Sequence, residues 1–271
     1  MQLSLSLHKM QTTLSDDNTA LYYLEDVCLN DYLGQMIRID YHHEIYCIAC
    51  GRKTTKSFNQ GYCFPCMRTL AECDSCIIKP ELCHYAQGSC REPEWGQRHC
   101  LKDHYVYLAN TGNVKVGITR LKNTPMRWID QGASQALPIL KVEQRLLSGL
   151  IEVALKSHIS DKTNWRTMLK APAPMLDLIA VKERLMPEIH EIIAELKTKY
   201  GADSVMAVDA DVLDIAYPVL QYPTKIASLN LDKTPLVEGR LMGIKGQYLM
   251  LDCGVINIRK FAGYRCDLTL F

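Results

Sequence analysis

The sequence has no long hydrophobic segment. No run approaches the ~20 apolar residues that a membrane-spanning helix needs, and the first residues, MQLSLSLHKMQTTLSDD, have neither the basic start nor the long apolar stretch of a secretory leader. We therefore expect a cytoplasmic protein without a membrane partner. Because thiols stay reduced in that compartment, clustered cysteines are better explained as metal ligands than as disulfides.

An excess of charge of one sign is also missing. The 31 lysines and arginines nearly balance the 30 aspartates and glutamates, which leaves a net charge of +1. Overall charge thus gives no indication of a nucleic-acid partner, and only a local basic patch could provide one. The chain has 271 residues, 48% of them hydrophobic, which is enough for one large domain or two to three small domains with a real core.

The residue pattern predicts an α+β fold in five parts. Residues 1–46 and 205–271 alternate in hydrophobicity like β-strands, and these two ends of the chain could pair with each other. Residues 47–103 form a cysteine-rich module that needs a metal because it has few long apolar runs. Residues 104–170 read as a hairpin, a short helix, a strand and a second helix. Residues 171–204 have helical spacing with a kink at Pro187.

Nine of the twelve cysteines lie between residues 47 and 100. The stretch CIACGRKTTKSFNQGYCFPC contains two C-x-x-C pairs, Cys47 with Cys50 and Cys63 with Cys66. Each pair can place two thiolates on one ion, and the spacer lets both pairs complete a tetrahedron. We expect a structural zinc ion, since four protein ligands leave no open position for catalysis.

A second group of cysteines predicts a second metal, with zinc favoured over an iron–sulfur cluster because the spacing matches no common cluster motif. The expected ligands are Cys73, Cys76, Cys83 and Cys90, and the alternatives are Cys100, His84 and His99, with His104 nearby. The three isolated cysteines, Cys28, Cys253 and Cys266, lie among apolar residues and are expected in the core.

The stretch YVYLANTGNVKVGITR, residues 105–120, predicts a hairpin. If both apolar sets share one face, the loop holds an odd number of residues, and Asn110-Thr111-Gly112 satisfies this condition. Tyr107 would then lie opposite Lys115. The polar face of the hairpin is either ordinary solvated sheet or the floor of a site.

This region resembles the GIY-YIG nuclease superfamily, in its variants with KIG as the second motif. The resemblance covers residues 104–170 and rests on YVY and KVG in the hairpin, on Arg127-Trp128, on Glu152 and on Asn164-Trp165. It implies a three-stranded antiparallel sheet with flanking helices.

The resemblance also implies roles for individual residues. Glu152 would bind a divalent metal such as Mg²⁺, Arg127 would contact phosphate, and Tyr107 would orient or deprotonate the water. The sequence departs from the family pattern at Lys115, which replaces the second tyrosine and could act as a base only if buried, and at Gln131, which replaces a histidine. Each residue also has an ordinary alternative: Glu152 could be a solvated helix residue, and Arg127 could brace the loop DQGAS.

The whole chain also resembles a bacterial zinc-containing family of unknown function through CGRKTTKSF, GYCFPC, KVGITR, RWIDQGA and GIKGQY. The last of these motifs predicts a β-turn or a phosphate-binding turn.

Three functions stay open: a nucleic-acid-binding protein with a catalytically reduced nuclease-like core, a Mg²⁺-dependent endonuclease, or a protein-interaction scaffold. The first two hypotheses both involve nucleic acid, and they assign phosphate contacts to Lys53, Arg120, Lys122 and Arg127. Lysine and arginine attract phosphates whether or not cleavage occurs.

Overall fold

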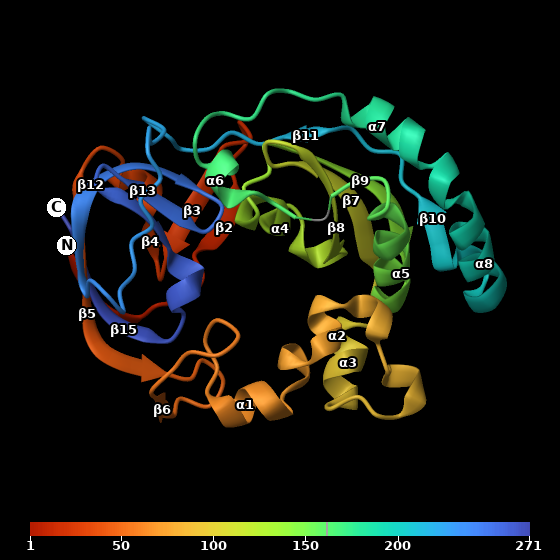
Figure 1. Ribbon diagram of the computed structural model, residues 1–271, viewed down its shortest axis with the longest axis horizontal. Coiled ribbons are helices and arrows are strands. Elements are labelled where there is room, and N and C mark those ends of the chain that lie inside the picture. Colours follow the sequence, from red (N-terminus) through yellow and green to blue (C-terminus); the bar gives the residue numbers. More distant parts are fainter. Residues whose placement is uncertain (161) are drawn as a thin grey trace.

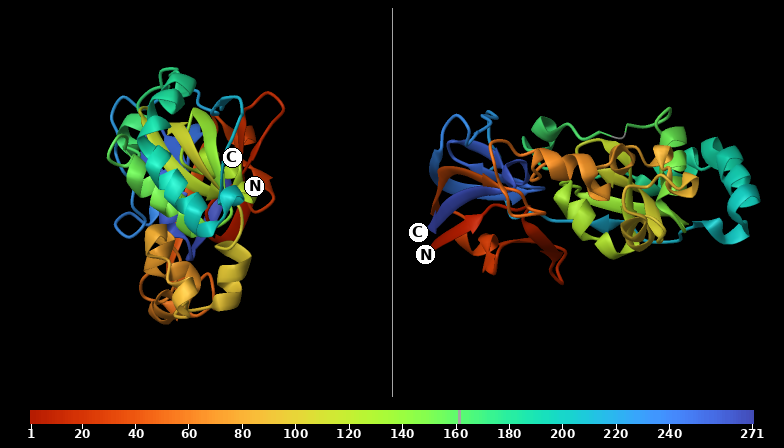
Figure 2. Two further views of the ribbon diagram at one scale, coloured as in Figure 1. Left: turned by 90° about the vertical axis from the view of Figure 1, so that its right-hand side faces the viewer. Right: turned by 90° about the horizontal axis from the view of Figure 1, so that it is seen from below.

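The two ends of the chain form one antiparallel sheet in the computed structural model, which describes residues 1–160 and 162–271. The sheet has seven strands, six of them in the order β1-β15-β5-β12-β13-β14, with β6 paired to β5. The expected pairing of the β-rich ends is confirmed, and both termini lie at the same end of the molecule (Figures 1 and 2). The strands span β1 (Gln2–Ser6), β5 (Met36–Tyr46), β6 (Lys53–Thr54), β12 (Leu236–Lys245), β13 (Tyr248–Leu251), β14 (Gly254–Asn257) and β15 (Tyr264–Leu270).

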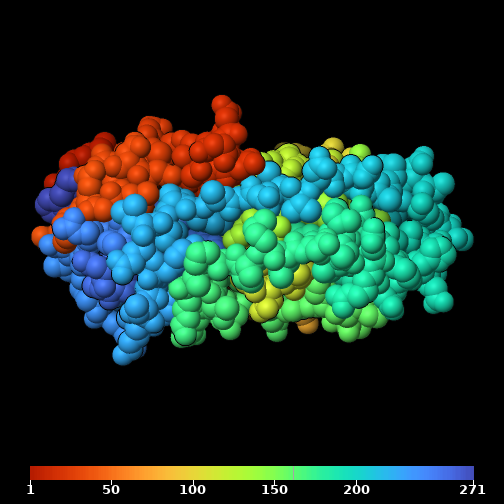
Figure 3. Space-filling view, turned by 90° about the horizontal axis from the view of Figure 1, so that it is seen from above, coloured from red at the N-terminus to blue at the C-terminus, as the bar shows by residue number. Residues whose placement is uncertain are grey.

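Alternation in the sequence explains this sheet. Along β5, the side chains of Ile37, Ile39 and Ile45 are buried while their neighbours are more exposed, which is the period of a strand with one face on a core. A small sheet of β2 (Gln11–Leu14), β3 (Ala20–Leu24) and β4 (Val27–Cys28) packs into the same core. Red and blue surfaces accordingly share one end of the molecule in Figure 3.

The turn within GIKGQY is a β-hairpin between β12 and β13. Lys245 pairs with Tyr248, and Gly246 has a φ of +62°, which favours glycine. The side chain of Gln247 is buried and bonds to the backbone of Met10 and to Asp130. The motif therefore joins the terminal sheet to the middle of the chain, and the β-turn interpretation is confirmed.

A second antiparallel sheet lies in the middle of the chain. Its five strands are β7 (His104–Asn110), β8 (Val114–Arg120), β9 (Gln135–Val142), β10 (Val205–Ala207) and β11 (Leu213–Asp214), in the order β10-β9-β7-β8 with β11 also on β9. The sheet thus has two short strands more than the three that the sequence led us to expect.

The hairpin register differs from the predicted one by two residues. Asn110 pairs with Val114, so the loop is Thr111 to Asn113, and Tyr107 lies opposite Gly117 rather than Lys115. Asn110 stays in the strand because its side-chain amide donates to Gln135 Oε1 (3.0 Å) and to the backbone carbonyl of residue 174 (2.7 Å). These long-range bonds decide the register.

Both faces of this sheet are covered. Helices α5 (Arg145–Leu155), α7 (Leu178–Leu185) and α8 (His190–Tyr200) pack on one face, and α4 (Met126–Asp130) covers part of the other (Figure 1). Tyr107 is fully buried and Lys115 is 5% exposed. The interpretation of their face as solvated sheet is therefore wrong. The short helix α6 (Trp165–Met168) packs against the terminal sheet, where the Trp165 ring stacks on Tyr248, and the expected kink at Pro187 lies between α7 and α8.

The cysteine-rich module contains α1 (Phe64–Thr69), α2 (Ser75–Ile78) and α3 (Pro93–His99) and lies below the sheets in Figure 1. It contacts α5 closely, since a Cβ on Gly149 would come 2.6 Å from the backbone nitrogen of Glu81. Within the described residues, no helix has the length and apolar character needed to cross a membrane.

Candidate functional site

The first four cysteines converge as the sequence predicts. The sulfur atoms of Cys47, Cys50, Cys63 and Cys66 all lie within 4.8 Å of one another, and those of Cys50 and Cys63 are 3.8 Å apart. A tight turn makes this possible: the backbone N–H of Gly51 donates to the Cys47 carbonyl, and Gly51 has a φ of +69°. Four converging thiols can bind a metal ion such as zinc.

The environment of Cys47 suits a metal ligand. Burial raises the pKa of its thiol, but backbone N–H groups of Cys63, Cys50 and Ala49 hydrogen bond to the sulfur and lower the pKa to about 6. The thiolate, which is the form that binds metals, is therefore stabilised at neutral pH.

The second cysteine group is arranged differently from the prediction. Cys73 contacts Asn59 and lies on the side of Cys47, whereas Cys76, Cys83 and Cys90 surround a separate small cavity together with Cys100. The Nδ1 of His99 donates to the Trp95 carbonyl of its own helix, and this histidine does not line the cavity. Among the isolated cysteines, Cys266 is buried as expected, but Cys28 is only half-buried and Cys253 is exposed.

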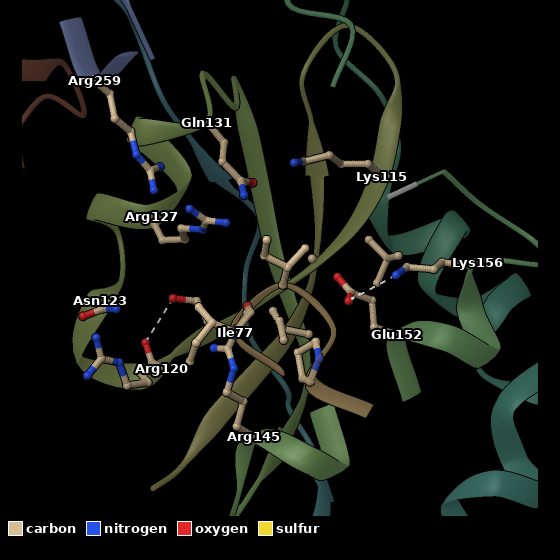
Figure 4. Close-up of a pocket in the computed structure, with 16 residues that line it drawn as sticks. Ile77, Lys115, Arg120, Asn123, Arg127, Gln131, Arg145, Glu152, Lys156 and Arg259 are labelled. Carbon is tan, nitrogen blue, oxygen red and sulfur yellow. Dashed lines mark hydrogen bonds and ion pairs between the residues drawn. The ribbon is translucent and has the colours of Figure 1, made fainter. Parts of the chain in front are cut away.

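A cleft of about 550 Å³ lies between the five-stranded sheet, α4, α5 and the cysteine-rich module (Figure 4). Its floor is β8, one wall is α4 with Gln131, and the opposite wall is α5. Ile77 and Pro80 of the cysteine-rich module close one side, and Arg259 reaches the cleft from near the C-terminus. The site thus combines residues of the middle sheet and its helices with residues from two distant parts of the chain, the cysteine-rich module and the region near the C-terminus.

Tyr107 lies beneath the floor of this cleft. Its ring lies under Gly117, where a Cβ would come 2.6 Å from the hydroxyl oxygen, and the hydroxyl donates to Gln131 Oε1 at 2.9 Å. Burial raises the pKa of the phenol, although the nearby Arg127 guanidinium opposes this effect. Tyr107 is therefore a protonated hydrogen-bond donor at neutral pH.

Positive charge dominates the cleft. Among the described lining residues there are six cationic side chains and one carboxylate, Glu152, an excess of five positive charges; the six are Lys115, Arg120, Arg127, Arg145, Lys156 and Arg259. In Figure 4, Arg127, Lys115 and Arg145 point toward the middle of the cleft from different sides. Such an arrangement attracts anions.

Two of these arginines have unsatisfied donors. Arg120 Nη1 and Arg145 Nε are buried without a hydrogen-bond partner in the part of the chain that the structure describes. Burial lowers the pKa of both guanidinium groups, and Arg127 and Arg120 repel Arg145 further. Arginine nevertheless stays charged, so a bound anion would reduce the repulsion among these guanidinium groups.

Glu152 lies on the opposite wall of the cleft, with its side chain only 12% exposed and its carboxylate 3.6 Å from Lys156 Nζ. It can accept a hydrogen bond or contribute one ligand to a divalent cation. One carboxylate among six cations is a weak Mg²⁺ site, however, unless a substrate phosphate adds ligands.

Sequence reasoning found part of this site. Tyr107, Lys115, Arg120, Arg127 and Glu152 all lie at the cleft, whereas Lys122 and Lys53 do not line it. Lys53 is exposed and ion-paired with Glu44. Three lining cations were missed, namely Arg145, Lys156 and Arg259. Arg145 and Lys156 could have been predicted, because their spacing places them on the same face of the helix as Glu152. Nothing in the sequence indicates the position of Arg259.

The fold and site define a mixed helix-and-sheet protein with several antiparallel sheets and a cysteine cluster able to bind metal. The family model described as "Protein of unknown function (DUF2797)" matches residues 34–266, so the chain belongs to that family. No curated protein and no solved structure matches the chain.

Proposed function

We propose that the protein binds nucleic acid in the cationic cleft and that zinc at Cys47, Cys50, Cys63 and Cys66 stabilises the module that closes one side of it. The observation that carries this proposal is the excess of five positive charges among the described lining residues. A net charge of +1 for the whole chain makes this local concentration unusual.

The geometry favours a phosphate-bearing ligand. Arginine presents a planar fork of donors that matches phosphate oxygens, and Arg120, Arg127 and Arg145 come from β8, α4 and α5. A phosphate in the cleft would also offset the repulsion that Arg120 and Arg127 exert on Arg145. Guanidinium groups from three elements can contact successive phosphates of a chain.

The core at residues 104–170 would then be a GIY-YIG-like core that has kept phosphate binding and reduced its catalysis. Lys115 stands where those nucleases have their second tyrosine, and it adds a cation to the cleft instead of a phenol. Lys115 is buried and lines the same cleft as the five other cations.

The test is binding of labelled single-stranded DNA, duplex DNA and RNA by fluorescence anisotropy at several salt concentrations. The variants Arg127→Gln and Arg259→Gln should weaken binding and reduce the slope of log K against log salt by about 0.9 for each duplex phosphate that the variant no longer neutralises. Lys53→Gln and Lys122→Gln are controls, since each removes one positive charge outside the cleft, and they should leave the slope unchanged.

Two results would contradict this proposal. If the wild-type protein binds none of the three nucleic acids at low salt, both nucleic-acid functions are wrong, and a protein-interaction scaffold becomes the better hypothesis. If the control variants lower the affinity more than the cleft variants do, the binding surface lies elsewhere.

The second candidate function is Mg²⁺-dependent phosphodiester cleavage. It is favoured by the position of Tyr107, Arg127 and Glu152, since Arg127 and Glu152 both act electrostatically on the Tyr107 phenol. The raised pKa of Tyr107 suits a residue that orients water rather than one that deprotonates it. Arg127 would stabilise the developing phosphate charge, and Glu152 would hold the metal.

This candidate is tested by incubating supercoiled DNA and structured RNA with the protein and Mg²⁺ or Mn²⁺. Glu152→Gln should abolish cleavage and keep or increase the affinity, because it removes the negative charge of the cleft. Absence of cleavage by the wild-type protein with either metal would leave binding as the function.

A further inference from the structure

The cavity inside the cysteine-rich module is a second cluster of metal-binding side chains, separate from the first. Cys76 comes from α2, Cys83 and Cys90 from the following loops, and Cys100 from the end of α3, and all four line one cavity. Cys83, Cys90 and Cys100 lie near enough to Cys76 to act electrostatically on its thiol. Cys83 and Cys90 act in the same way on Cys100.

Ligand atoms of Asp74 and His84 lie within 4.8 Å of each other and of the Cys76 sulfur, but both side chains already have other partners. Asp74 accepts from Arg91 Nε at 2.9 Å, is 3.3 Å from His84 Nε2, and bonds to Ser75 through its other oxygen. The second ring nitrogen of His84 is 2.9 Å from Ser89 Oγ. A metal on Asp74 and His84 would have to break these contacts, whereas one on the four thiols would break none of them.

The sulfur spacing distinguishes this group from the first. Thiolates on a single zinc lie about 3.8 Å apart, given Zn–S bonds of about 2.3 Å in a tetrahedron, and the four sulfurs of the first cluster are within 4.8 Å of one another. Among the described residues, the four sulfurs around the second cavity do not form such a close group. They line a separate small cavity instead.

We propose that Cys76, Cys83, Cys90 and Cys100 hold an iron–sulfur cluster, each of them contributing one thiolate ligand to an iron. A cluster keeps its four cysteine ligands farther apart than a single ion does, and four cysteines are the usual ligand set of such clusters. The cavity is also lined by the half-buried side chains of Ile77, Tyr85 and Trp95. Cys100 takes the place that the sequence pattern assigns to Cys73.

This centre would support the wall of the cationic cleft. The carbonyl of Ile77, next to Cys76, accepts from Arg145 Nη2 at 2.6 Å, and the carbonyl of Cys100 accepts from the Arg145 backbone N–H at 2.8 Å. Two ligand-bearing segments therefore orient the same cleft arginine. The proposal does not depend on what the cleft binds.

The test is metal and sulfide analysis of the full chain purified without oxygen. We expect iron and acid-labile sulfide in equal amounts, a broad visible absorption band that dithionite bleaches, and one zinc ion. A colourless protein without iron and sulfide, or one with two zinc ions, would overturn the proposal. Because this result comes from the wild-type protein, it does not depend on how well variants fold.

Single Cys→Ser variants then assign the ligands. Cys76→Ser, Cys90→Ser and Cys100→Ser should lose most of the iron and keep the zinc, whereas Cys50→Ser should lose the zinc and keep the iron. Cys73→Ser and Cys253→Ser are the controls and should keep both metals. Loss of iron in Cys73→Ser with retention in Cys100→Ser would overturn the ligand assignment.

Discussion

Gly117 lies directly across the β7–β8 hairpin from Tyr107, and a Cβ at position 117 would come 2.6 Å from both Cζ and the hydroxyl oxygen of that tyrosine. Tyr107 has little room to move, because it is fully buried and its hydroxyl is bound to Gln131. The glycine thus lets the tyrosine lie beneath the floor of the cleft.

Gly117→Ala should therefore destabilise the protein by about 1–3 kcal/mol, the usual cost of overpacking a core. Urea unfolding followed by circular dichroism measures this change. The control is a double-mutant cycle with Tyr107→Ala, which removes the clashing ring, so the alanine at position 117 should cost much less in that background. An equal cost in both backgrounds would show that the contact is not the cause.

Gly149→Ala tests the contact between α5 and the cysteine-rich module. An alanine inside a helix is normally about 1 kcal/mol more favourable than a glycine, but here the Cβ would meet the backbone of Glu81. We expect net destabilisation and weaker nucleic-acid binding, because the wall with Ile77 and Pro80 would move. Val153→Ala, at an exposed position of the same helix, should change neither. A more stable Gly149→Ala variant would contradict the close packing.

His104 should make stability depend on pH. Burial lowers the pKa of this imidazole to about 4 from 6.5, and its Nδ1–H donates to the Lys102 carbonyl at 2.6 Å. The folded protein therefore keeps His104 neutral while the unfolded chain binds a proton. The contribution of His104 to the free energy of unfolding is thus complete above pH 6.5 and is lost as the pH falls to 4. This contribution is on the order of 3 kcal/mol.

The measurement is the free energy of unfolding of the wild-type protein and of His104→Gln between pH 4 and 7. In the variant, the free energy of unfolding should fall much less between pH 6.5 and pH 4 than in the wild type. The control His8→Gln, at an exposed position, should follow the wild type. Parallel curves for wild type and His104→Gln would contradict the lowered pKa.

Zinc removal should unfold the first part of the cysteine-rich module. Metal binding and folding are coupled in small zinc modules, and the segment around Cys47, Cys50, Cys63 and Cys66 has few buried apolar residues of its own. Treatment with a zinc chelator, or Cys63→Ser, should lower the Tm and increase proteolysis between residues 47 and 70. Cys28→Ser should retain zinc and the wild-type cleavage pattern. An unchanged pattern after zinc loss would show that the metal is dispensable for this fold.

Local spacing was enough to predict the cysteine cluster. Two C-x-x-C pairs determine which thiols can reach one ion, because the turn that joins Cys47 to Cys50 involves only neighbouring residues. Hydrophobic alternation likewise predicted the β-rich stretch that contains β5, and the second helix predicted within residues 104–170 is α5. Each of these features depends on residues near one another in the chain.

The second cysteine group could not be assigned in this way. Cys73 and Cys76 have the spacing of a ligand pair, yet the turn between them directs Cys73 toward Asn59 and leaves Cys76 at the cavity. Cys100 joins the group because α3 carries it there. Spacing alone does not report such a change of direction.

The sequence by itself predicted the β-rich ends, the hairpin, strand and main helices of the middle part, the first cysteine cluster and five of the residues at the cleft. The tertiary structure alone decided the hairpin register, because Asn110 is held in the strand by Gln135 and by residue 174. It also decided the charge of the cleft, since Arg259 joins Arg127 only when the terminal sheet packs against α4. Contacts between distant segments depend on which surfaces meet in the core, and no local pattern of residues encodes that choice.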